Sequence, residues 1–334
     1  METRDCMTQF ACRARRSRSR LAVAMFTTVM LALGAGKTSG QDYPNKPIRL
    51  VTTPAGGGVA LSARLVADGL AVPLSHHIIV DNRPQILIGP IVAKASPDGY
   101  TLLFAANDFW IAPFLQDNVP WNMVEFSAVS LVVRYPSILV LHPSVAASSV
   151  RELIELAKSK PGVLNYASGL AGGPNHLAAE LFKYMAGVSI VRIPYTGGGP
   201  ALTALLAGQV QLLFGSAGSV SPHLKSGRLR ALAVTGAQPS ALAPGLPTVA
   251  AAGLPGYQSI GISGIFAPAN TPAKIINRLS QEIARLTNRA DVKEKFLSLG
   301  AEPVGSSPEE FSAFIKSDMA TWGNVIKAAG IRAE

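Results

Sequence analysis

The sequence has 334 residues, a formal net charge of +10 and 48% hydrophobic residues. Half of that charge lies in residues 1–40, which hold seven Lys or Arg and two Asp or Glu and so contribute +5. The rest of the chain has only a mild positive surplus without a basic block, which argues against a nucleic-acid partner.

The N-terminal segment, residues 1–40, has the order of a secretory signal peptide. A positive region precedes the apolar run Leu21–Ala35, and the small residues Thr38–Gly40 follow. The positive region contains Arg13, Arg15, Arg16, Arg18 and Arg20. The apolar run is shorter than the roughly 20 residues of a membrane span, so we expect cleavage and export to the periplasm rather than a permanent anchor.

Both cysteines, Cys6 and Cys12, lie in this segment, and no cysteine stands near the expected cleavage site at Gln41. The mature protein is therefore expected to lack a disulfide, a thiol nucleophile and a lipid anchor.

Beyond the signal peptide, short apolar runs alternate with segments of helical periodicity, which predicts an α/β fold with largely parallel sheets. The predicted strands are Ile48–Thr52, Ile78–Asp81, Thr101–Ala105, Ile138–Leu141, Leu164–Ala167, Val210–Phe214, Leu229–Val234 and Gly264–Ala267. Three later helices have recognisable starts. These are a capping box at Ser149–Glu152, a proline at Pro272, and Ser307 with Glu310.

Three predicted strands lead into glycine-rich loops that each open a helix. These loops are Pro54–Gly58 before Val59–Leu70, Ser168–Gly173 before Pro174–Met185, and Thr196–Gly199 before Pro200–Ala207. Helix N-termini present unpaired N–H groups and a partial positive charge, and glycine permits close approach of a ligand. Each loop alone is compatible with a tight turn, but three uncharged loops together favour an anion-binding cleft.

Enzymatic motifs are missing from the sequence. The first loop lacks the spacing of a dinucleotide fingerprint, and there is neither a P-loop nor a nucleophile elbow. None of the five histidines belongs to a metal-site motif, and Asp98 and Glu180 are interpreted as a turn residue and a helix-face residue. We therefore expect no enzyme activity, no metal and no cofactor.

A series of motifs in a fixed order resembles the substrate-binding proteins of tripartite tricarboxylate transporters, the Bug family. The motifs are YPNKPIRLV, AGGG, VDNRP, SPDGYTLLF, ELIELAKSKPG, HLAAELF, PYTGGGPA, LRALAVT, LPTVAAAGLPGY and SPEEF, which is followed by Trp322. The resemblance runs from about Tyr43 to Gly330.

The resemblance implies a two-lobed clamp of the type II periplasmic-binding-protein class, with one lobe formed by 42–141 plus 259–334 and the other by 142–258. It also implies a monomer that captures a small carboxylate between the lobes and delivers it to two integral membrane subunits of a transporter. Together with the glycine loops it indicates these ligand-binding residues: Ala55, Gly56, Gly57, Gly58, Val59, Asn107, Ser168, Gly169, Gly172, Gly173, His176, Tyr195, Thr196, Gly197, Gly198 and Ser216. His176 is compatible with ligand contact or with support of its turn.

The sequence departs from the family pattern near the expected site. Val59 and Ala60 replace a hydroxyl residue and an aspartate, Gly215 replaces another aspartate, and the stretch after Arg83-Pro84 is shortened. Fewer acidic groups would disfavour an amino acid ligand and favour an apolar or aromatic carboxylate. Arg83 is compatible with ligand contact or with a structural role in its turn.

Three other functions remain open at this point. The protein could present its ligand to a membrane sensor kinase, it could be a paralogue that has lost binding, or it could be an exported hydrolase. The missing catalytic groups disfavour the last of these.

Overall fold

The computed structural model describes residues 43–55, 58–169 and 172–332. The predicted signal peptide, both cysteines, Gly56 and Gly57 lie outside the described residues. The α/β class is confirmed.

The strands form two sheets that share strand β4. The first sheet contains β1 (Ile48–Thr52), β2 (Ile78–Asn82), β3 (Thr101–Ala106), β9 (Ile260–Pro268), β10 (Glu302–Pro303) and the beginning of β4 (Phe126–Leu141). The second contains the end of β4 with β5 (Asn165–Ser168), β6 (Val191–Pro194), β7 (Leu212–Ser216) and β8 (Arg230–Val234).

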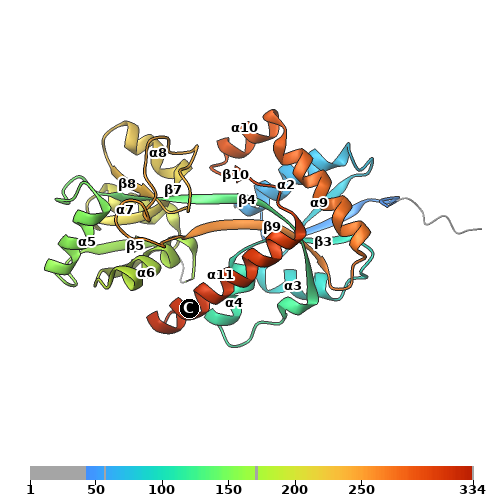
Figure 1. Cartoon of the computed structure of the whole chain (residues 1–334), viewed down its shortest axis with the longest axis horizontal. Coiled ribbons are helices and arrows are strands. Elements are labelled where there is room, and N and C mark those ends of the chain that lie inside the picture. Colours follow the sequence, from blue (N-terminus) through green and yellow to red (C-terminus); the bar gives the residue numbers. More distant parts are fainter. Residues whose placement is uncertain (1–42, 56–57, 170–171, 333–334) are drawn as a thin grey trace, which may run out of the picture. The chain divides into compact units, whose positions relative to one another are not determined.

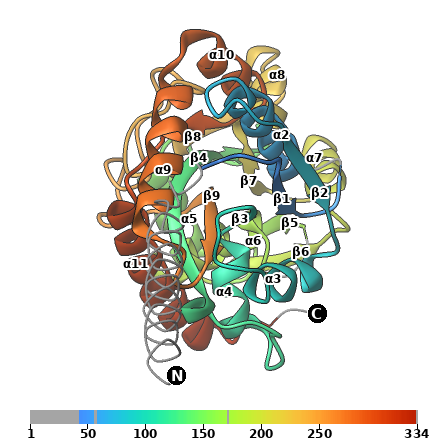
Figure 2. The same cartoon turned by 90° about the vertical axis from the view of Figure 1, so that its right-hand side faces the viewer.

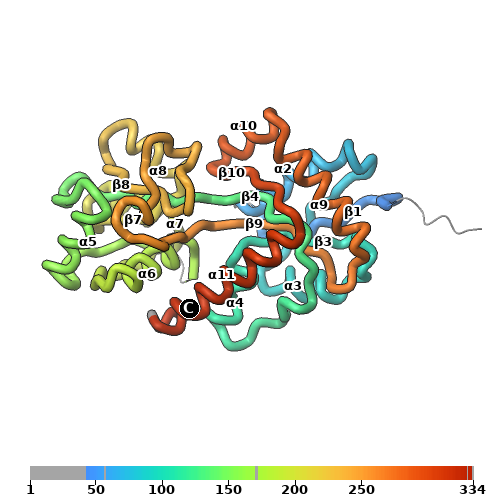
Figure 3. Tube along the Cα trace, in the orientation of Figure 1, coloured from blue at the N-terminus to red at the C-terminus, as the bar shows by residue number. Residues whose placement is uncertain are grey.

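Strand β4 pairs with β9 from Phe126 to Pro136 and with β7 from Ser137 onward, so one strand runs from the first sheet into the second. The chain returns through Ser259, whose N–H donates to Thr235, and enters β9 (Figure 1). The tube in Figure 3 follows the same two passages. The overall strand order is β2-β1-β3-β9-β4-β7-β5-β6.

Helices alternate between the two faces of each sheet because the crossovers reverse direction. From β1 the chain moves outward to β2 through α2 (Gly58–Ala71) and returns past β1 to β3 through α3 (Gln85–Ala93). Right-handed crossovers of opposite direction place their helices on opposite faces, and Figure 2 shows α2 and α3 on opposite sides of the strands. The same reversal occurs in the second sheet with α6 (Pro174–Ala186) and α7 (Gly198–Leu206).

The remaining helices cover the faces and edges of the two sheets. They are α4 (Asp108–Leu115), the 3-10 helix η1 (Met123–Glu125), α5 (Val150–Ser159), α8 (Ala217–Lys225), α9 (Ala273–Asn288), α10 (Ala290–Ser298) and α11 (Pro308–Ala329).

Two apolar clusters hold the layers together. The larger joins α4, α6 and α11, with Phe109, Phe182 and Phe311 fully buried. The smaller packs α7 and α8 against the opposite face of the second sheet, with Leu205 and Val220 fully buried.

Elements of the two sheets also meet through bare backbone at Gly218 in α8 and Gly300 after α10. A Cβ on Gly300 would lie 3.4 Å from the Gly218 nitrogen, and Gly300 has φ +72°. A side chain at Gly300 would therefore be strained by the backbone and crowded by its neighbour.

The expected strands and long helices are present, but the sheets are mixed rather than largely parallel. Strands β4, β9 and β10 pair antiparallel to their neighbours because the chain passes back and forth between the sheets. Ser149 caps α5 as predicted, yet the Glu152 carboxylate accepts from Ser148 instead of completing the capping box.

Candidate ligand-binding site

The second glycine loop follows β5 and is held by two side chains. The Gly172 N–H donates to Nδ1 of His176 at 3.0 Å. From strand β6, Arg192 donates to the Ser168 hydroxyl at 2.8 Å and to the Gly169 carbonyl at 3.1 Å. His176 is 5% exposed, so its ring supports the loop from within the protein, and Arg192 adds a positive charge that the sequence pattern did not reveal.

The third glycine loop lies directly against the second. The Tyr195 N–H donates to the Ser168 carbonyl at 2.9 Å. A Cβ on Gly169 would lie 3.4 Å from the Cα of Gly197, so the two loops adjoin backbone to backbone. Around Gly197 and Gly198 the space that a side chain would occupy is open.

A pocket of about 400 Å³ connects the second loop with elements of the first sheet. From the first sheet it is lined by Val59, Gln85, Ala106, Asn107, Asp108, Ala112, Leu115, Gln116 and Trp121, and from the second by Gly172, Gly173, Pro174 and Leu177. These residues follow β1, β2, β3 and β5 in the chain. Ligands of open α/β sheets bind outside the carboxyl ends of strands where the strand order reverses, which is where this pocket lies.

Both the backbone conformation and the close contacts at position 172 require glycine. Its φ is +76°, a region that side-chain-bearing residues rarely adopt, and a Cβ would lie 2.7 Å from Cδ1 of Leu115 in α4. The loop therefore reaches α4 closely only because residue 172 has no side chain.

Four of the predicted ligand-binding residues line this pocket: Val59, Asn107, Gly172 and Gly173. Asn107 is 7% exposed and directs its amide toward the Ile260 carbonyl at 3.5 Å. Ser216 is not among the described lining residues, and its hydroxyl lies 2.8 Å from that of Ser219. For the remaining predicted residues, contact with ligand stays a prediction, and Gly56 and Gly57 lie outside the described residues.

Asp108 is a site residue that the sequence analysis missed. It begins α4 directly after β3, and Gln85 Nε2 donates to its Oδ2 at 3.3 Å. Asp108 is exposed to solvent, and partial desolvation by the surrounding protein atoms raises its pKa. The sequence carries only a weak signal for it, an acidic residue three positions after the predicted strand Thr101–Ala105.

The three substitutions among the family departures have different structural consequences. Val59 lines the pocket, whereas Ala60 is 1% exposed within α2. A Cβ on Gly215 would lie 2.5 Å from Cγ1 of Val220. Of these three positions, only residue 59 can present a side chain to this pocket.

Arg83 takes part in an ion pair within its turn, which agrees with the structural interpretation of this residue. Its Nε lies 2.8 Å from Oδ1 of Asp81, and the Arg49 guanidinium pairs with the other oxygen of that carboxylate. The two guanidinium groups lower the Asp81 pKa against the opposing effect of burial.

Glu180 is buried, which corrects its interpretation as a helix-face residue. It is 7% exposed and accepts hydrogen bonds from the Tyr166 hydroxyl and, at 2.6 Å, from Lys183 Nζ. His176 Nε2 lies 4.0 Å from the same carboxylate, so His176 does have a carboxylate partner four residues along the helix, contrary to the sequence-based expectation. No group of three or more potential metal ligands occurs within the described part of the chain.

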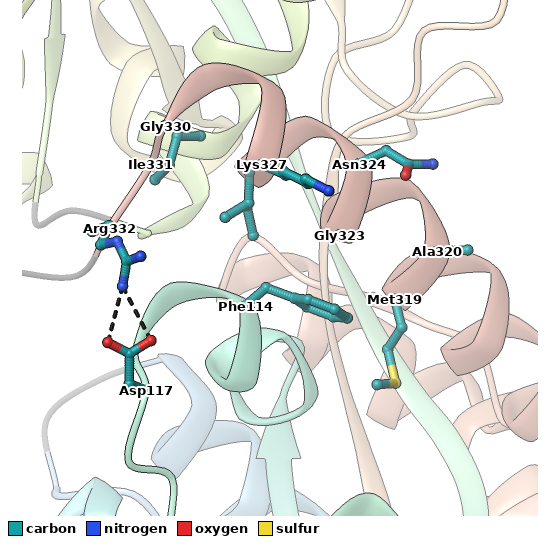
Figure 4. A pocket seen from close by; sticks show the side chains of 11 residues that line it. Phe114, Asp117, Met319, Ala320, Gly323, Asn324, Lys327, Gly330, Ile331 and Arg332 are labelled. Carbon is teal, nitrogen blue, oxygen red and sulfur yellow. Dashed lines mark hydrogen bonds and ion pairs between the residues drawn. The ribbon is translucent and has the colours of Figure 1, made fainter.

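A larger hollow of about 600 Å³ lies between α4 and α11 (Figure 4). One face of α11, including Gly323 and Lys327, lines it with Phe114, and the exposed ion pair of Arg332 with Asp117 borders it. None of the described glycine-loop residues reaches this hollow. The smaller pocket is therefore the better candidate for a ligand site.

None of the helices within the described ranges is long and apolar enough to span a membrane.

Comparison with known proteins identifies relatives over nearly the whole chain. The tripartite tricarboxylate transporter family receptor domain matches residues 62–331. Protein BugT of Bordetella pertussis is 32% identical over 305 residues, which cover 89% of this chain and 94% of that protein.

Two solved structures with bound carboxylates are similar. R. palustris Rpa4515 with adipate is 32% identical with a TM-score of 0.70, over 87% of this chain and 99% of that one. MatC from Rhodopseudomonas palustris with bound malate is 27% identical with a TM-score of 0.67, over 85% and 100%. With these neighbours, the expected two-lobed fold is confirmed.

Proposed function

The chain belongs to the tripartite tricarboxylate transporter receptor family, and from this premise we propose that it captures a small carboxylate in the pocket between Asp108 and Gly172. The observation that carries the proposal is the pocket itself. It brings the second glycine loop, which opens α6, to the strand ends of the first sheet.

We further propose that the lobes are residues 42–141 plus 259–334 and residues 142–258. The pocket takes residues from both of these ranges. A ligand that contacts both lobes stabilises the arrangement in which they lie close together, because it binds that arrangement better.

Backbone groups are sufficient to hold the ligand's carboxylate. A helix N-terminus contributes about 0.3–2 kcal/mol toward an anion, and each hydrogen bond to a charged group about 1.5–3 kcal/mol. Micromolar binding requires about 8 kcal/mol. Several N–H groups at the starts of α6 and α7 reach this sum, with Arg192 adding positive charge behind them.

Export to the periplasm, cleavage of residues 1–40 and delivery to membrane subunits complete the proposal. Two similar solved structures, one described as a periplasmic transporter and one as the periplasmic binding protein BugD, support the location. The protein acts by binding and release, without turnover.

Isothermal titration with mono-, di- and tricarboxylates, and with the corresponding amides, tests the proposal. We expect at least one carboxylate to bind with a micromolar or lower Kd and its amide not to bind. Absence of binding across all carboxylates would overturn the proposal.

Gly172→Ala provides a localised test with a matched control. Both Gly172 and Gly162 have φ near +76° to +77°, but a Cβ at Gly162 meets nothing within 4 Å. We expect Gly172→Ala to weaken binding at least tenfold because the loop must withdraw from Leu115, and Gly162→Ala to leave the Kd unchanged.

A further inference from the structure

The pocket has a marked charge asymmetry. Among the described residues that line it, Asp108 is the one whose side chain carries a formal charge. On the other side, Arg192 places its guanidinium behind the second glycine loop and donates to the Gly169 carbonyl. A negative group therefore stands opposite a positively polarised loop.

Two opposing influences act on the Asp108 carboxylate: desolvation raises its pKa, and hydrogen-bond donors around it lower the pKa. The amide of Gln85 donates to the carboxylate at 3.3 Å, and the backbone N–H groups at the start of α4 lower its pKa. It also occupies the first turn of α4, where the helix dipole stabilises a negative charge. These donors and the helix dipole stabilise the ionised carboxylate against the desolvation that opposes it.

An ionised carboxylate in a pocket without a cationic side chain constrains what can bind beside it. An unsubstituted carboxylic acid would bring a second negative charge and no donor, and like charges at short range repel. A ligand that also has an ammonium or hydroxyl group would instead offer a donor to Asp108, and hydrogen bonds to charged groups are among the stronger ones in proteins.

We propose that Asp108 is a specificity-determining residue that selects carboxylates bearing a hydrogen-bond donor, an ammonium or hydroxyl group, close to the acid group. This inference rests on the proposed function. It also revises the sequence-based preference for an apolar or aromatic ligand, since Asp108 supplies an acidic group where those at Ala60 and Gly215 are missing.

Matched compound sets test the inference by titration calorimetry. Succinate, malate and aspartate share one carbon skeleton and differ only in hydrogen, hydroxyl or ammonium. Propanoate, lactate and alanine form a shorter set, and adipate with its 2-hydroxy and 2-amino derivatives forms a longer one. In whichever set binds, we expect the substituted members to bind about tenfold to hundredfold more tightly than the unsubstituted one.

Variants assign that preference to Asp108. Asp108→Asn should abolish the preference, while Asp108→Glu, which keeps the acid, should retain it. Asp117→Asn is the matched control, because Asp117 pairs with Arg332 on the surface and does not line the pocket. Thermal unfolding without ligand shows whether each variant is folded.

The outcomes separate the inference from the function beneath it. Tighter binding of the ammonium compound than the hydroxyl compound would identify charge as the basis of selection, and equal binding would identify the hydrogen bond. Equal binding of the unsubstituted member, or a preference that survives Asp108→Asn, would overturn the inference but not carboxylate capture. If no member of any set binds, both the inference about Asp108 and the proposed carboxylate capture are overturned.

Discussion

Helix α4 is held beside the pocket by aromatic packing, whereas the second glycine loop opposite it is held by polar side chains. Phe109 stacks on Trp121 at 4.7 Å with an interplanar angle of 8°, and it meets the edge of Phe126 at 5.2 Å. Beneath the loop, His176 and Arg192 bond to loop backbone atoms. One wall thus depends on shape and burial, and the other on hydrogen bonds and charge.

This difference predicts that truncating an apolar side chain in the first wall lowers the free energy of unfolding more than removing a polar partner in the second wall. Aromatic side chains contribute through large buried area. A polar network contributes less net free energy, because its groups also bond well to water in the unfolded chain.

The largest effect is expected for Phe109→Ala. Phe109 is fully buried in the aromatic cluster, and its truncation leaves a cavity. We expect a loss of about 3–5 kcal/mol in the free energy of unfolding, measured by chemical denaturation. Phe114→Ala on the same helix is the control, since Phe114 is 38% exposed; an equal loss there would contradict the role of the cluster.

A pH-dependent effect is expected at Asp318, which belongs to the same wall. Its carboxylate accepts from Trp110 Nε1 at 2.9 Å and from Trp322 Nε1 at 3.0 Å, and burial raises its pKa to about 6. Between its ordinary pKa of 3.8 and about 6, the folded state binds more protons than the unfolded state. The stability contribution of this group therefore falls as pH rises through that window.

Comparison with Asp318→Asn isolates this titration. From pH 4 to pH 7 the free energy of unfolding of the wild-type protein should fall relative to that of the variant by up to about 3 kcal/mol. Asp117→Asn, at an exposed ion pair, should give a difference that varies little over the same range. A constant difference between wild type and Asp318→Asn would show that Asp318 titrates normally.

The smallest effect is expected for Glu180→Gln in the second wall. Tyr166 and Lys183 donate to the same oxygen, Oε1, so the glutamine carbonyl can still accept from both, but the ion pair with Lys183 is lost. Because Lys183 is 22% exposed and can reach water, we expect a loss of about 2 kcal/mol. Glu155→Gln on the exposed face of α5 should change stability by less than about 0.5 kcal/mol. A loss at Glu180 larger than that at Phe109 would reverse the comparison of the walls.

Most of the sequence-based prediction rests on two local patterns. Apolar runs indicate buried strands, and glycine-rich stretches indicate loops that can approach a ligand. The first part of β4 was not predicted, since Ser127, Ser130 and Arg134 interrupt its apolar run. Helices α3 and α4 each contain an internal proline, Pro90 and Pro113, which weakens their helical signal.

Side-chain direction was beyond the reach of the sequence. Gly215 was counted as a lost acidic group, but its Cβ would point at Val220. Asp108 was not singled out because one acidic residue after a strand has no distinguishing pattern. Only the pairing of strands brings it to the same pocket as Gly172.

The contact between Gly218 and Gly300 has a consequence for the proposed capture of a ligand between two lobes. Packed side chains interlock, and sliding one surface over another then forces rotamers to change. At this point neither residue has a side chain seated in the other surface. The two backbone segments can therefore shift past each other without a change of rotamers. A bulky residue at either position would interlock with the opposite surface and resist that shift.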